Sequence, residues 1–593
     1  MRRTNDSKRK NRNLRDVDDD LYLDLPEIDI HSADTRRTGR TSGRRSTYDG
    51  AGRQASGQSR STGQTGSRNS AMAGHTSGSG NRDQNGRGIE SINIRSGNRN
   101  ETNGRGRYAA SSRARNGRGG RSGRSGRSST KEYTLITYLV LFLFLAMVAY
   151  FVYFMSFKSE DFIANSYNPR MNNLSAKVIR GDIETSDGKV IATTKVASDG
   201  TKTRFYPEGH TYAFVTGYSG KGMTGLEKTQ NFKLLTSHTS VIEHIQNALK
   251  QQQNTGDTVI STVNSTVQEA AYKALGSAHG AVIAMDPETG RVLAMVSKPD
   301  YNPNTIVSDW DSLNATSEES SPLLNRATQG LYAPGSTFKI VTALEYLREG
   351  NSVNDKFHCD GSYTHDGYTI SCAAHEVHGD ETTETAFVNS CNVAFAQMGL
   401  KLNVSDWRST AEDLLFNKKL PSSLGSTRKS TFALTTDSTD AEIMSTAFGQ
   451  GKTTVTPAHM MMIVSAIANK GILMKPTLVQ AISSADKAVV QEKDPVSYKT
   501  LMSEDEAATL QTFMKEVAEQ STRGKLKSDS YTAYGKTGSA EYQTGVDNTH
   551  SWFVGFADNG QKKIAIAVIG EKKGYGVSFA VPVAKQVFDA YLK

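Results

Sequence analysis

The chain has 593 residues, enough for two or three domains, and its formal net charge of +9 is unevenly distributed. Residues 1–130 carry 27 Lys and Arg but only 13 Asp and Glu, a net charge of +14, which leaves −5 for the remainder. Because this segment consists mainly of Arg, Gly, Ser and Asn, it cannot build a packed core. We therefore expect residues 1–132 to be a disordered basic tail, and the charge balance excludes a strongly basic folded part.

The Arg-Gly repeats between residues 104 and 127 are typical of low-complexity segments that bind polyanions. Apart from Tyr108, they lack the aromatic residues that stack on nucleic acid bases. We expect no specific nucleic acid partner. Attraction to anionic lipid headgroups is the simpler role for a basic segment beside a membrane.

Residues 133–157 contain no charged residue and are almost entirely apolar. As a helix they would extend roughly 37 Å, enough to cross a hydrocarbon layer of about 30 Å. Seven basic residues precede this run, whereas Lys158 on its other side is followed by Glu160 and Asp161. The positive-inside rule then predicts a single-pass protein of the cell membrane with a cytoplasmic N-terminus and an extracytoplasmic remainder.

The next hundred residues, 158–255, are too few for a large enzyme, and their β-rich runs with intervening turn residues predict a small β-rich pedestal. A globular domain is expected over residues 256–593. Its pattern predicts an amphipathic helix over Val267–Leu275, hairpins over 281–296 and 551–569, and a final helix over Val583–Tyr591. Strands at both ends of the domain, with helices between them, favour an α+β fold whose antiparallel sheet is flanked by helices.

The sequence Ala333-Pro334-Gly335-Ser336-Thr337-Phe338-Lys339 contains a candidate nucleophile and a candidate base. Pro334 and Gly335 disfavour regular helix before Ser336, and the apolar spacing after it predicts that a helix begins there. On a helix, Ser336 and Lys339 share a face, which can bring hydroxyl and amine within hydrogen-bonding reach. Burial among apolar residues would lower the pKa of Lys339, and the helix N-terminus would offer N–H groups to an oxyanion. Ser-x-x-Lys also occurs at Ser186, Ser426 and Ser484, so the motif is significant only with further elements.

Two such elements follow in the same domain. Ser390-Cys391-Asn392 supplies a hydroxyl that can relay a proton and an amide that can hold both the lysine and a substrate carbonyl. Lys536-Thr537-Gly538-Ser539 contains the only Lys-Thr-Gly of the chain. If these residues form a strand, Lys536 and Gly538 share one face, Gly538 lets substrate backbone pair along the edge, and Lys536 with Thr537 can attract a carboxylate.

In this order, the three elements resemble the active-site motifs of the serine penicillin-recognising enzymes. The segments 322–327, 448–451 with 455–457, and 550–556 look like the transpeptidase domain of class B penicillin-binding proteins, and Arg180-Gly181, Tyr206-Pro207, Gly217-Tyr218 and 225–227 look like their pedestal. The resemblance covers residues 158–593. It implies a monofunctional peptidoglycan D,D-transpeptidase that cross-links stem peptides in cell-wall synthesis and is acylated by β-lactams.

The resemblance also implies a role for each motif residue. Ser336 would attack the D-Ala-D-Ala carbonyl with Lys339 as base, Ser390 would assist departure of D-Ala, and an amine of a neighbouring stem peptide would resolve the acyl-enzyme. Lys536 and Thr537 would bind the terminal carboxylate, Gly538 would line the substrate strand, and the N–H groups of Ser336 and Ser539 would form the oxyanion hole. The expected protein partner is a polytopic glycan polymerase of the shape, elongation, division and sporulation family.

Alternatives remain open at this stage. A D,D-carboxypeptidase differs only in using water as acceptor, and a non-enzymatic cell-wall scaffold would work through the tail. A bifunctional polymerase-transpeptidase lacks room for its glycan-polymerising domain, and a class A β-lactamase would need a Glu-x-x-Leu-Asn element that is missing after Asn392. The sequence does not distinguish elongation, division and sporulation.

We expect neither a cofactor nor a metal ion. Cys359 and Cys372 could close a short disulfide outside the cytoplasm or remain thiols, and the sequence favours neither outcome. Cys391 is interpreted as a small buried residue.

Overall fold

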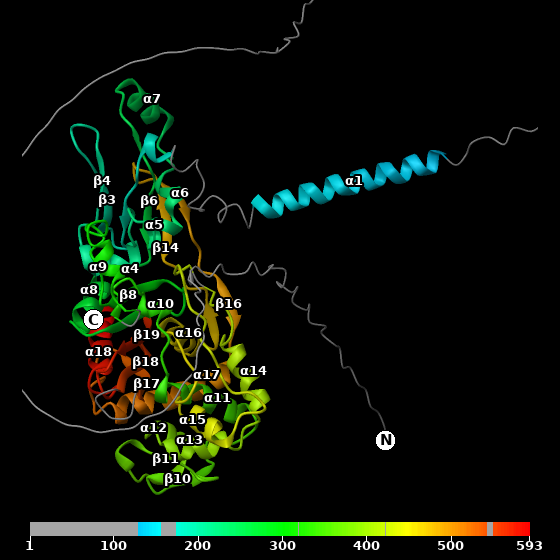
Figure 1. Ribbon diagram of the computed structural model, residues 1–593, viewed down its shortest axis with the longest axis vertical. Helices are drawn as coiled ribbons and strands as arrows, with labels where there is room; N and C mark the ends of the chain where they lie inside the picture. The colour runs from blue at the N-terminus through cyan, green and yellow to red at the C-terminus, as the bar shows by residue number, and fades with distance from the viewer. Residues whose placement is uncertain (1–128, 156–173, 318–319, 422, 542–548) are drawn as a thin grey trace, which may run out of the picture. The chain divides into compact units, whose positions relative to one another are not determined.

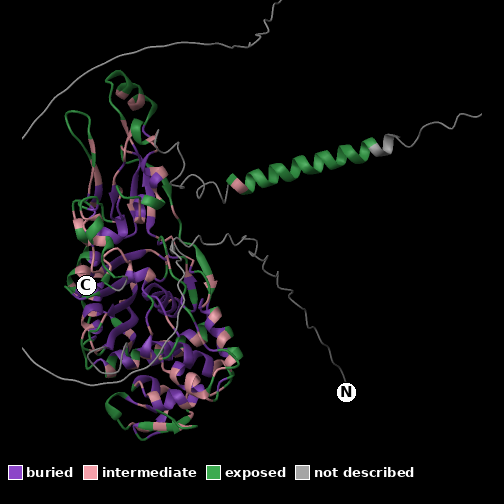
Figure 2. Cartoon of the chain, in the orientation of Figure 1, coloured by how far each residue is buried: buried purple, intermediate pink, exposed green. Residues whose placement is uncertain are grey.

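The structure, a computed structural model, describes residues 129–155, 174–317, 320–421, 423–541 and 549–593. The predicted basic tail therefore lies almost entirely outside the described residues. Helix α1 (Ser129–Tyr153) coincides with most of the predicted span. Its segment Tyr133–Tyr153 has a mean hydropathy of 2.6 and is long and apolar enough to cross a membrane. The apolar side chains of this segment are exposed (Figure 2), as expected of a helix whose apolar surroundings would be lipid.

A five-stranded antiparallel sheet forms the centre of the C-terminal part and confirms the predicted α+β fold (Figure 1). Both predicted hairpins are present. The first is β7/β8, and the second is β18/β19, which lies between β7 and the edge strand β17. The strands, in spatial order, are β17 (Thr532–Glu541), β18 (Thr549–Asp558), β19 (Lys563–Gly570), β7 (Gly280–Met285) and β8 (Val292–Lys298).

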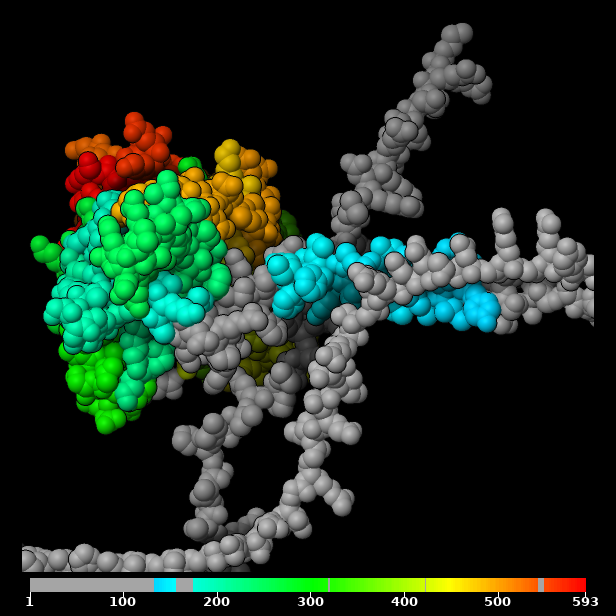
Figure 3. All heavy atoms as spheres, turned by 90° about the horizontal axis from the view of Figure 1, so that it is seen from above, coloured from blue at the N-terminus to red at the C-terminus, as the bar shows by residue number. Residues whose placement is uncertain are grey.

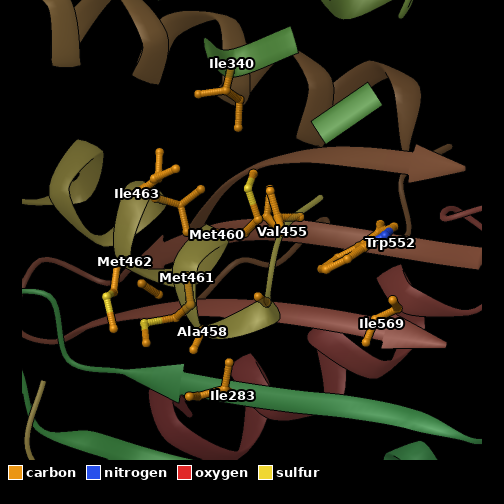
Figure 4. Packing of buried hydrophobic residues seen from close by; sticks show 14 of the residues in the cluster. Ile283, Ile340, Val455, Ala458, Met460, Met461, Met462, Ile463, Trp552 and Ile569 are labelled. Atoms are coloured by element: carbon orange, nitrogen blue, oxygen red, sulfur yellow. The ribbon is translucent and has the colours of Figure 1, made fainter. Parts of the chain in front are cut away.

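Helices cover both faces of this sheet. On one face lie α8 (Ser265–Leu275) and α18 (Ala580–Leu592), which confirm the predicted helices and pack on alternate sheet residues such as Val282 and Val568. On the other face, α16 (Pro457–Ala468) packs against Ile283 and Ile569 (Figure 4). Because successive strand residues point to opposite faces, both sets of side chains are buried.

The caps of these helices follow from their sequence. The Asn264 side chain accepts a hydrogen bond from the Val267 N–H at 3.1 Å and so begins α8. Thr456 does the same for the His459 N–H at 3.2 Å, and Pro457 occupies the first turn of α16, where its missing N–H costs nothing.

A helical lobe beside the sheet carries the first two predicted motifs. The turn η4 (Gly335–Phe338) leads into α11 (Lys339–Arg348), and α12 (Thr383–Val388) is followed directly by α13 (Asn392–Gly399). The other helices of this part are α9 (Trp310–Asn314), α10 (Arg326–Gln329), η5 (Ala373–His375), α14 (Val404–Asp413), α15 (Asp440–Ala447), α17 (Glu504–Glu516) and η6 (Val517–Ser521). Short antiparallel strand pairs complete it: β9 (Lys356–Cys359) with β12 (Gly379–Thr382), β10 (Ser362–His365) with β11 (Tyr368–Ser371), and β13 (Ile472–Met474) with β16 (Ser497–Thr500).

A second, six-stranded sheet lies in the predicted pedestal region but is not built from that region alone. Strand β6 continues it beyond residue 255, and β14 and β15 join it from more than 200 residues further along the chain. In Figure 3 these gold residues lie beside the cyan and green ones of the pedestal. The order is β15 (Val489–Glu492), β14 (Val479–Ser483), β6 (Thr258–Ser261), β2 (Ile183–Glu184), β3 (Val190–Val196) and β4 (Lys202–Phe205).

Short elements surround this pedestal sheet. Strands β1 (Val178–Ile179) and β5 (Asn254–Thr255) pair in parallel. The helices are η2 (Gly209–Tyr212), α4 (Ala213–Thr216), α5 (Gly225–Thr229), α6 (Asn231–Leu234) and α7 (Val241–Leu249).

One buried carboxylate connects the pedestal elements. Glu227 of α5 accepts hydrogen bonds from Arg180 Nε at 2.6 Å and Arg204 Nε at 2.7 Å, and its own side chain is fully buried. Burial alone would raise the pKa of Glu227, but Arg204 and Arg180 hold it below its usual range. The ionised triad therefore connects β4, α5 and the segment before β2.

Candidate active site

Ser336 lies in a tight turn in which Gly335 contacts a second glycine, Gly449. Gly335 has φ +54°, and its N–H donates to the carbonyl of Gly449 at 2.9 Å. A Cβ at Gly449 would lie 1.9 Å from the Gly335 oxygen, so only glycine allows this approach. The turn presents the half-buried Ser336 at the start of η4, close to the predicted helix start.

Lys339, one turn later, is completely buried and makes three hydrogen bonds to the second motif. Its Nζ donates to the Ser390 carbonyl at 2.5 Å, to Asn392 Oδ1 at 2.8 Å and to Ser390 Oγ at 3.3 Å. Among the described residues, the structure records no hydrogen bond from Lys339 to Ser336, although the helical spacing allowed one. Burial lowers the pKa of Lys339 to about 7, although the nearby Cys391 and Cys372 act to raise it. A substantial fraction of this amine is therefore neutral near pH 7 and can accept a proton.

The second motif is held by an unusual backbone conformation between two helices. Ser390 has φ +55°, which is rare for a residue with a side chain and turns the chain sharply from α12 into α13. Cys391 caps α13, because its Sγ accepts the Ala394 N–H at 3.3 Å. Asn392 Nδ2 donates to the Ser371 carbonyl at 3.0 Å, which fixes its Oδ1 toward Lys339.

The third motif forms part of the edge strand β17, as predicted. Lys536 is fully buried, and its Nζ has no hydrogen-bond partner among the described residues. It lies 5.4 Å from the centre of the Phe387 ring. Burial, and secondarily the charge of Lys339, places its pKa well below the usual range. An unpartnered buried amine is costly, so this position favours an incoming anion.

The neighbouring residues of β17 explain how this strand reaches the nucleophile. Thr537 and Ser539 are half-buried on one face, and Lys536 and Gly538 share the other, as the strand pattern predicted. A Cβ at Gly538 would lie 2.9 Å from Thr337 Cγ2 and 3.2 Å from the Pro334 oxygen. Gly538 therefore permits close contact between β17 and the turn that carries Ser336. The sequence did not suggest this reason for a glycine at position 538.

Sequence reasoning missed three supporting residues. Gly449 and Ser371 act through backbone contacts that no local pattern reveals. Trp552 donates from Nε1 to the Ala333 carbonyl at 3.1 Å and ties β18 to the residues before the nucleophile. Gly449 and Trp552 lay in segments that resembled class B enzymes, whereas Ser371 had no signal of this kind.

Comparisons with known proteins agree with this geometry. The family described as "Penicillin binding protein transpeptidase domain" matches residues 280–589, and "Penicillin binding protein A dimerisation domain" matches residues 180–259. Peptidoglycan D,D-transpeptidase PbpA of Mycolicibacterium smegmatis is 31% identical over 447 residues, which span 70% of this chain and 89% of that protein. Peptidoglycan D,D-transpeptidase MrdA of Acinetobacter baumannii is 27% identical over 459 residues, 66% of each chain.

A solved structure has the same fold. Penicillin-binding protein A from M. tuberculosis, as its ceftriaxone acyl-enzyme complex, superposes with a TM-score of 0.65 at 27% identity. The match covers 71% of this chain and all of that one. In that relative, a β-lactam forms an acyl-enzyme.

Proposed function

Since the chain belongs to the class B penicillin-binding protein transpeptidases, we propose that it is a serine D,D-transpeptidase that cross-links peptidoglycan stem peptides and is acylated by β-lactams. One observation supports this most directly. The turn that carries Ser336 and the adjoining strand β17 contain two buried lysines: Lys339, which is held by the second motif and has a pKa of about 7, and Lys536, which has no hydrogen-bond partner in the described structure.

The proposed acylation uses each motif in turn. The Ser336 hydroxyl attacks the D-Ala-D-Ala carbonyl while neutral Lys339 accepts its proton. Backbone N–H groups of Ser336 and Ser539 stabilise the oxyanion. Collapse of the tetrahedral intermediate breaks the peptide bond, and the leaving D-Ala receives a proton through Ser390, which contacts Lys339.

Recognition and resolution use the remaining residues. Lys536 and Thr537 bind the terminal carboxylate, Asn392 holds a substrate carbonyl, and Gly538 and Ser539 line the substrate strand along β17. An amine of a second stem peptide then attacks the ester carbonyl and releases Ser336. A carboxypeptidase would use water for this last step.

The test is acylation of the full chain in detergent by a fluorescent penicillin, followed by mass spectrometry of the labelled peptide. We expect label on Ser336 that disappears in Ser336→Ala. The matched control is Ser426→Ala, because Ser426 begins another Ser-x-x-Lys motif but is exposed. Label that persists in Ser336→Ala, or a folded wild-type protein that takes none, contradicts the proposal. Incubation with a D-Ala-D-Ala peptide and an acceptor amine then separates the two reactions: cross-linked product supports the transpeptidase, and free D-Ala with hydrolysed peptide alone supports the carboxypeptidase.

We further propose the arrangement that the sequence suggested: a cytoplasmic tail (1–132), one span (133–157), a pedestal (158–255) and an extracytoplasmic catalytic domain (256–593). The Arg-rich flank before the span supports this orientation. Protease added to intact spheroplasts should digest the catalytic domain and spare an epitope at the N-terminus. The reverse pattern contradicts the orientation.

A polytopic glycan polymerase of the shape, elongation, division and sporulation family is the proposed partner, contacting the span and the pedestal. Helix α7 of the pedestal supports this, since four of its apolar side chains are exposed: Val241, Ile242, Ile245 and Leu249. Ile242→Asp with Ile245→Asp should reduce co-purification of the polymerase while penicillin labelling is retained. Unchanged co-purification would remove this helix from the proposed contact.

A further inference from the structure

Three cysteines and one histidine from separate segments meet beside the second motif. Cys359 ends β9, Cys372 follows β11, His378 precedes β12 and Cys391 caps α13. Their four potential ligand atoms all lie within 4.8 Å of one another, and the three cysteines are buried. We call these four residues the thiol cluster.

The distances within the thiol cluster do not match disulfide bonding. Cys359 Sγ lies 3.6 Å from Cys372 Sγ, and Cys372 Sγ lies 3.8 Å from Cys391 Sγ, whereas a disulfide joins its sulfurs at about 2.0 Å. All three cysteines are free thiols. A disulfide joins two cysteines, so it would leave the third one unpaired. A metal ion, in contrast, can bind all three sulfurs at once.

The same distances match tetrahedral coordination. With Zn–S bonds of about 2.3 Å and a Zn–N bond of about 2.0 Å, tetrahedral angles place sulfurs about 3.8 Å apart and sulfur about 3.5 Å from nitrogen. The observed sulfur separations are 3.6 and 3.8 Å, and Cys359 Sγ lies 3.4 Å from His378 Nδ1. Three sulfurs and one imidazole are a ligand set of structural zinc sites.

The surroundings supply the outer contacts that such ligands require. Backbone N–H groups of Gly361 and Ala394 donate to the sulfurs of Cys359 and Cys391 at 3.4 and 3.3 Å, which stabilises negative charge on sulfur. The other ring nitrogen of His378 faces Glu376, with Nε2 and Oε2 3.9 Å apart. At this separation the carboxylate lies beside the ring without a hydrogen bond to it.

We propose that the thiol cluster binds one Zn²⁺ as a closed structural site. Binding forms three Zn–S bonds and one Zn–N bond, and the three displaced thiol protons pass to solvent. With all four positions filled by protein, the ion has no place for water or substrate and holds segments together. This departs from the expectation of a chain without a metal ion.

The position of the cluster connects it to the proposed chemistry. Cys391 lies between Ser390, whose carbonyl accepts from Lys339, and Asn392. Cys372 follows Ser371, whose carbonyl accepts from Asn392 at 3.0 Å. An ion bound to both cysteines therefore joins the two segments whose contact orients the partners of Lys339. The ligands are positioning residues, because none of them touches the reacting atoms.

A second group of candidate ligands provides a control. His365, Asp366 and Asp440 also lie close together, but Asp366 is exposed, the other two are only half-buried, and the group contributes only three ligands. A surface group of this kind is common without a metal ion.

The first experiment measures zinc by inductively coupled plasma mass spectrometry in the full chain purified in detergent without chelator. We expect about one zinc per chain for wild type and His365→Ala, and a large loss for Cys372→Ala and His378→Ala. The wild type also gives a test that needs no variant to fold. After chelation and addition of Co²⁺, it should show the intense visible absorption of tetrahedral thiolate-bound cobalt. Zinc near zero without this spectrum, or a Cys359–Cys372 disulfide found by non-reducing peptide mapping, overturns the proposal.

The second experiment, which rests on the proposed acyl transfer, compares penicillin labelling before and after chelation. Without the ion, Ser390 and Asn392 should be less precisely positioned, and acylation should be slower by up to about 10²-fold. Added Zn²⁺ should restore the rate. Chelated protein that acylates at the unchanged rate overturns the positioning role. The two proposals can fail separately. The zinc measurement tests the metal site without any catalysis, and penicillin labelling of untreated wild type tests the proposed function without any chelator.

Discussion

The two buried lysines of the site differ in what compensates their burial. Lys339 has three oxygen acceptors, whereas Lys536 has no hydrogen-bond partner within the described part of the chain. Both pKa values are lowered by desolvation, so both amines are poised to change protonation when substrate arrives. Their proposed tasks differ accordingly: one accepts a proton, and the other receives an anion.

The pKa of Lys339 predicts the pH dependence of acylation. Its neutral form is the base, and this form becomes more abundant as pH rises through about 7. We expect the second-order rate of penicillin acylation to rise roughly tenfold per pH unit below that value and to level off above it. Stopped-flow labelling of the wild type between pH 5 and 9 measures this. A profile that falls with rising pH over this range would assign the base role to another group.

Lys536 should show a conflict between stability and function. In Lys536→Met, the apolar side chain keeps most of the volume and removes the buried unpaired amine, which costs about 1–3 kcal/mol in typical proteins. The variant should therefore unfold at a higher temperature while penicillin acylation falls by at least tenfold. Differential scanning calorimetry and the labelling rate measure the two effects. A variant that is less stable than wild type would show that the amine has a stabilising partner.

At the scale of secondary structure, close backbone contacts position the nucleophile. The Gly449 carbonyl accepts the Gly335 N–H and the Gly449 Cα lies close to the Gly335 oxygen, while Gly538 lets β17 pass beside Thr337 and Pro334. Neither contact depends on a functional group. Each depends on a missing Cβ, so the geometry of η4 is set by elements that are distant in sequence.

Gly449→Ala should disrupt this turn. Gly449 and Gly425 both have φ +83°, but a Cβ at Gly425 would meet nothing within 4 Å. Gly425→Ala therefore carries only the conformational cost of about 1 kcal/mol, whereas Gly449→Ala adds a clash with the Gly335 oxygen. We expect acylation by fluorescent penicillin to fall at least tenfold more in Gly449→Ala than in Gly425→Ala. Equal rates in the two variants would show that the turn tolerates displacement.

Across the whole molecule, the pedestal and the catalytic part share a sheet. Strand β14 pairs with β6, and β6 pairs in parallel with β2, so residues 479–483 stabilise a region centred almost 300 positions earlier. Since these strands exchange backbone hydrogen bonds, a substitution that destabilises the pedestal should also destabilise β14 in the catalytic part.

Glu227→Gln tests this coupling. The substitution leaves Arg180 and Arg204, both largely buried, without their carboxylate, and breaking such a buried pair typically costs about 3–5 kcal/mol. Hydrogen exchange should accelerate in the pedestal and also in β14. Glu269→Gln is the control, because the Glu269 pair with Lys189 is half-exposed and is worth at most about 1 kcal/mol. Faster exchange confined to residues before 262 would contradict the coupling.

Local patterns in the chain sufficed for much of this protein. Helix α8, both hairpins, the final helix and the long apolar helix α1 follow from periodicity, apolar composition and turn residues, which act over a few positions. The motif residues Ser336, Lys339, Ser390, Asn392 and Lys536 were identified by their order and by resemblance. The predicted pedestal boundary, in contrast, carried no sign of β14 and β15, because strand pairing across hundreds of residues leaves no local pattern.

The sequence established the kind of chain, its chemical groups and the order in which they occur, since these depend on residue identity and short-range geometry. Folding in three dimensions added the hydrogen bonds of Lys339 to the second motif, the isolation of Lys536, the glycine contacts of the nucleophile turn and the meeting of Cys359, Cys372, His378 and Cys391. The hydrogen bonds of Lys339 and the glycine contacts join segments at least 51 positions apart, and the thiol cluster extends from Cys359 to Cys391. Burial and long-range packing create them, and the free energy of such contacts depends on the whole core rather than on any neighbouring stretch of sequence.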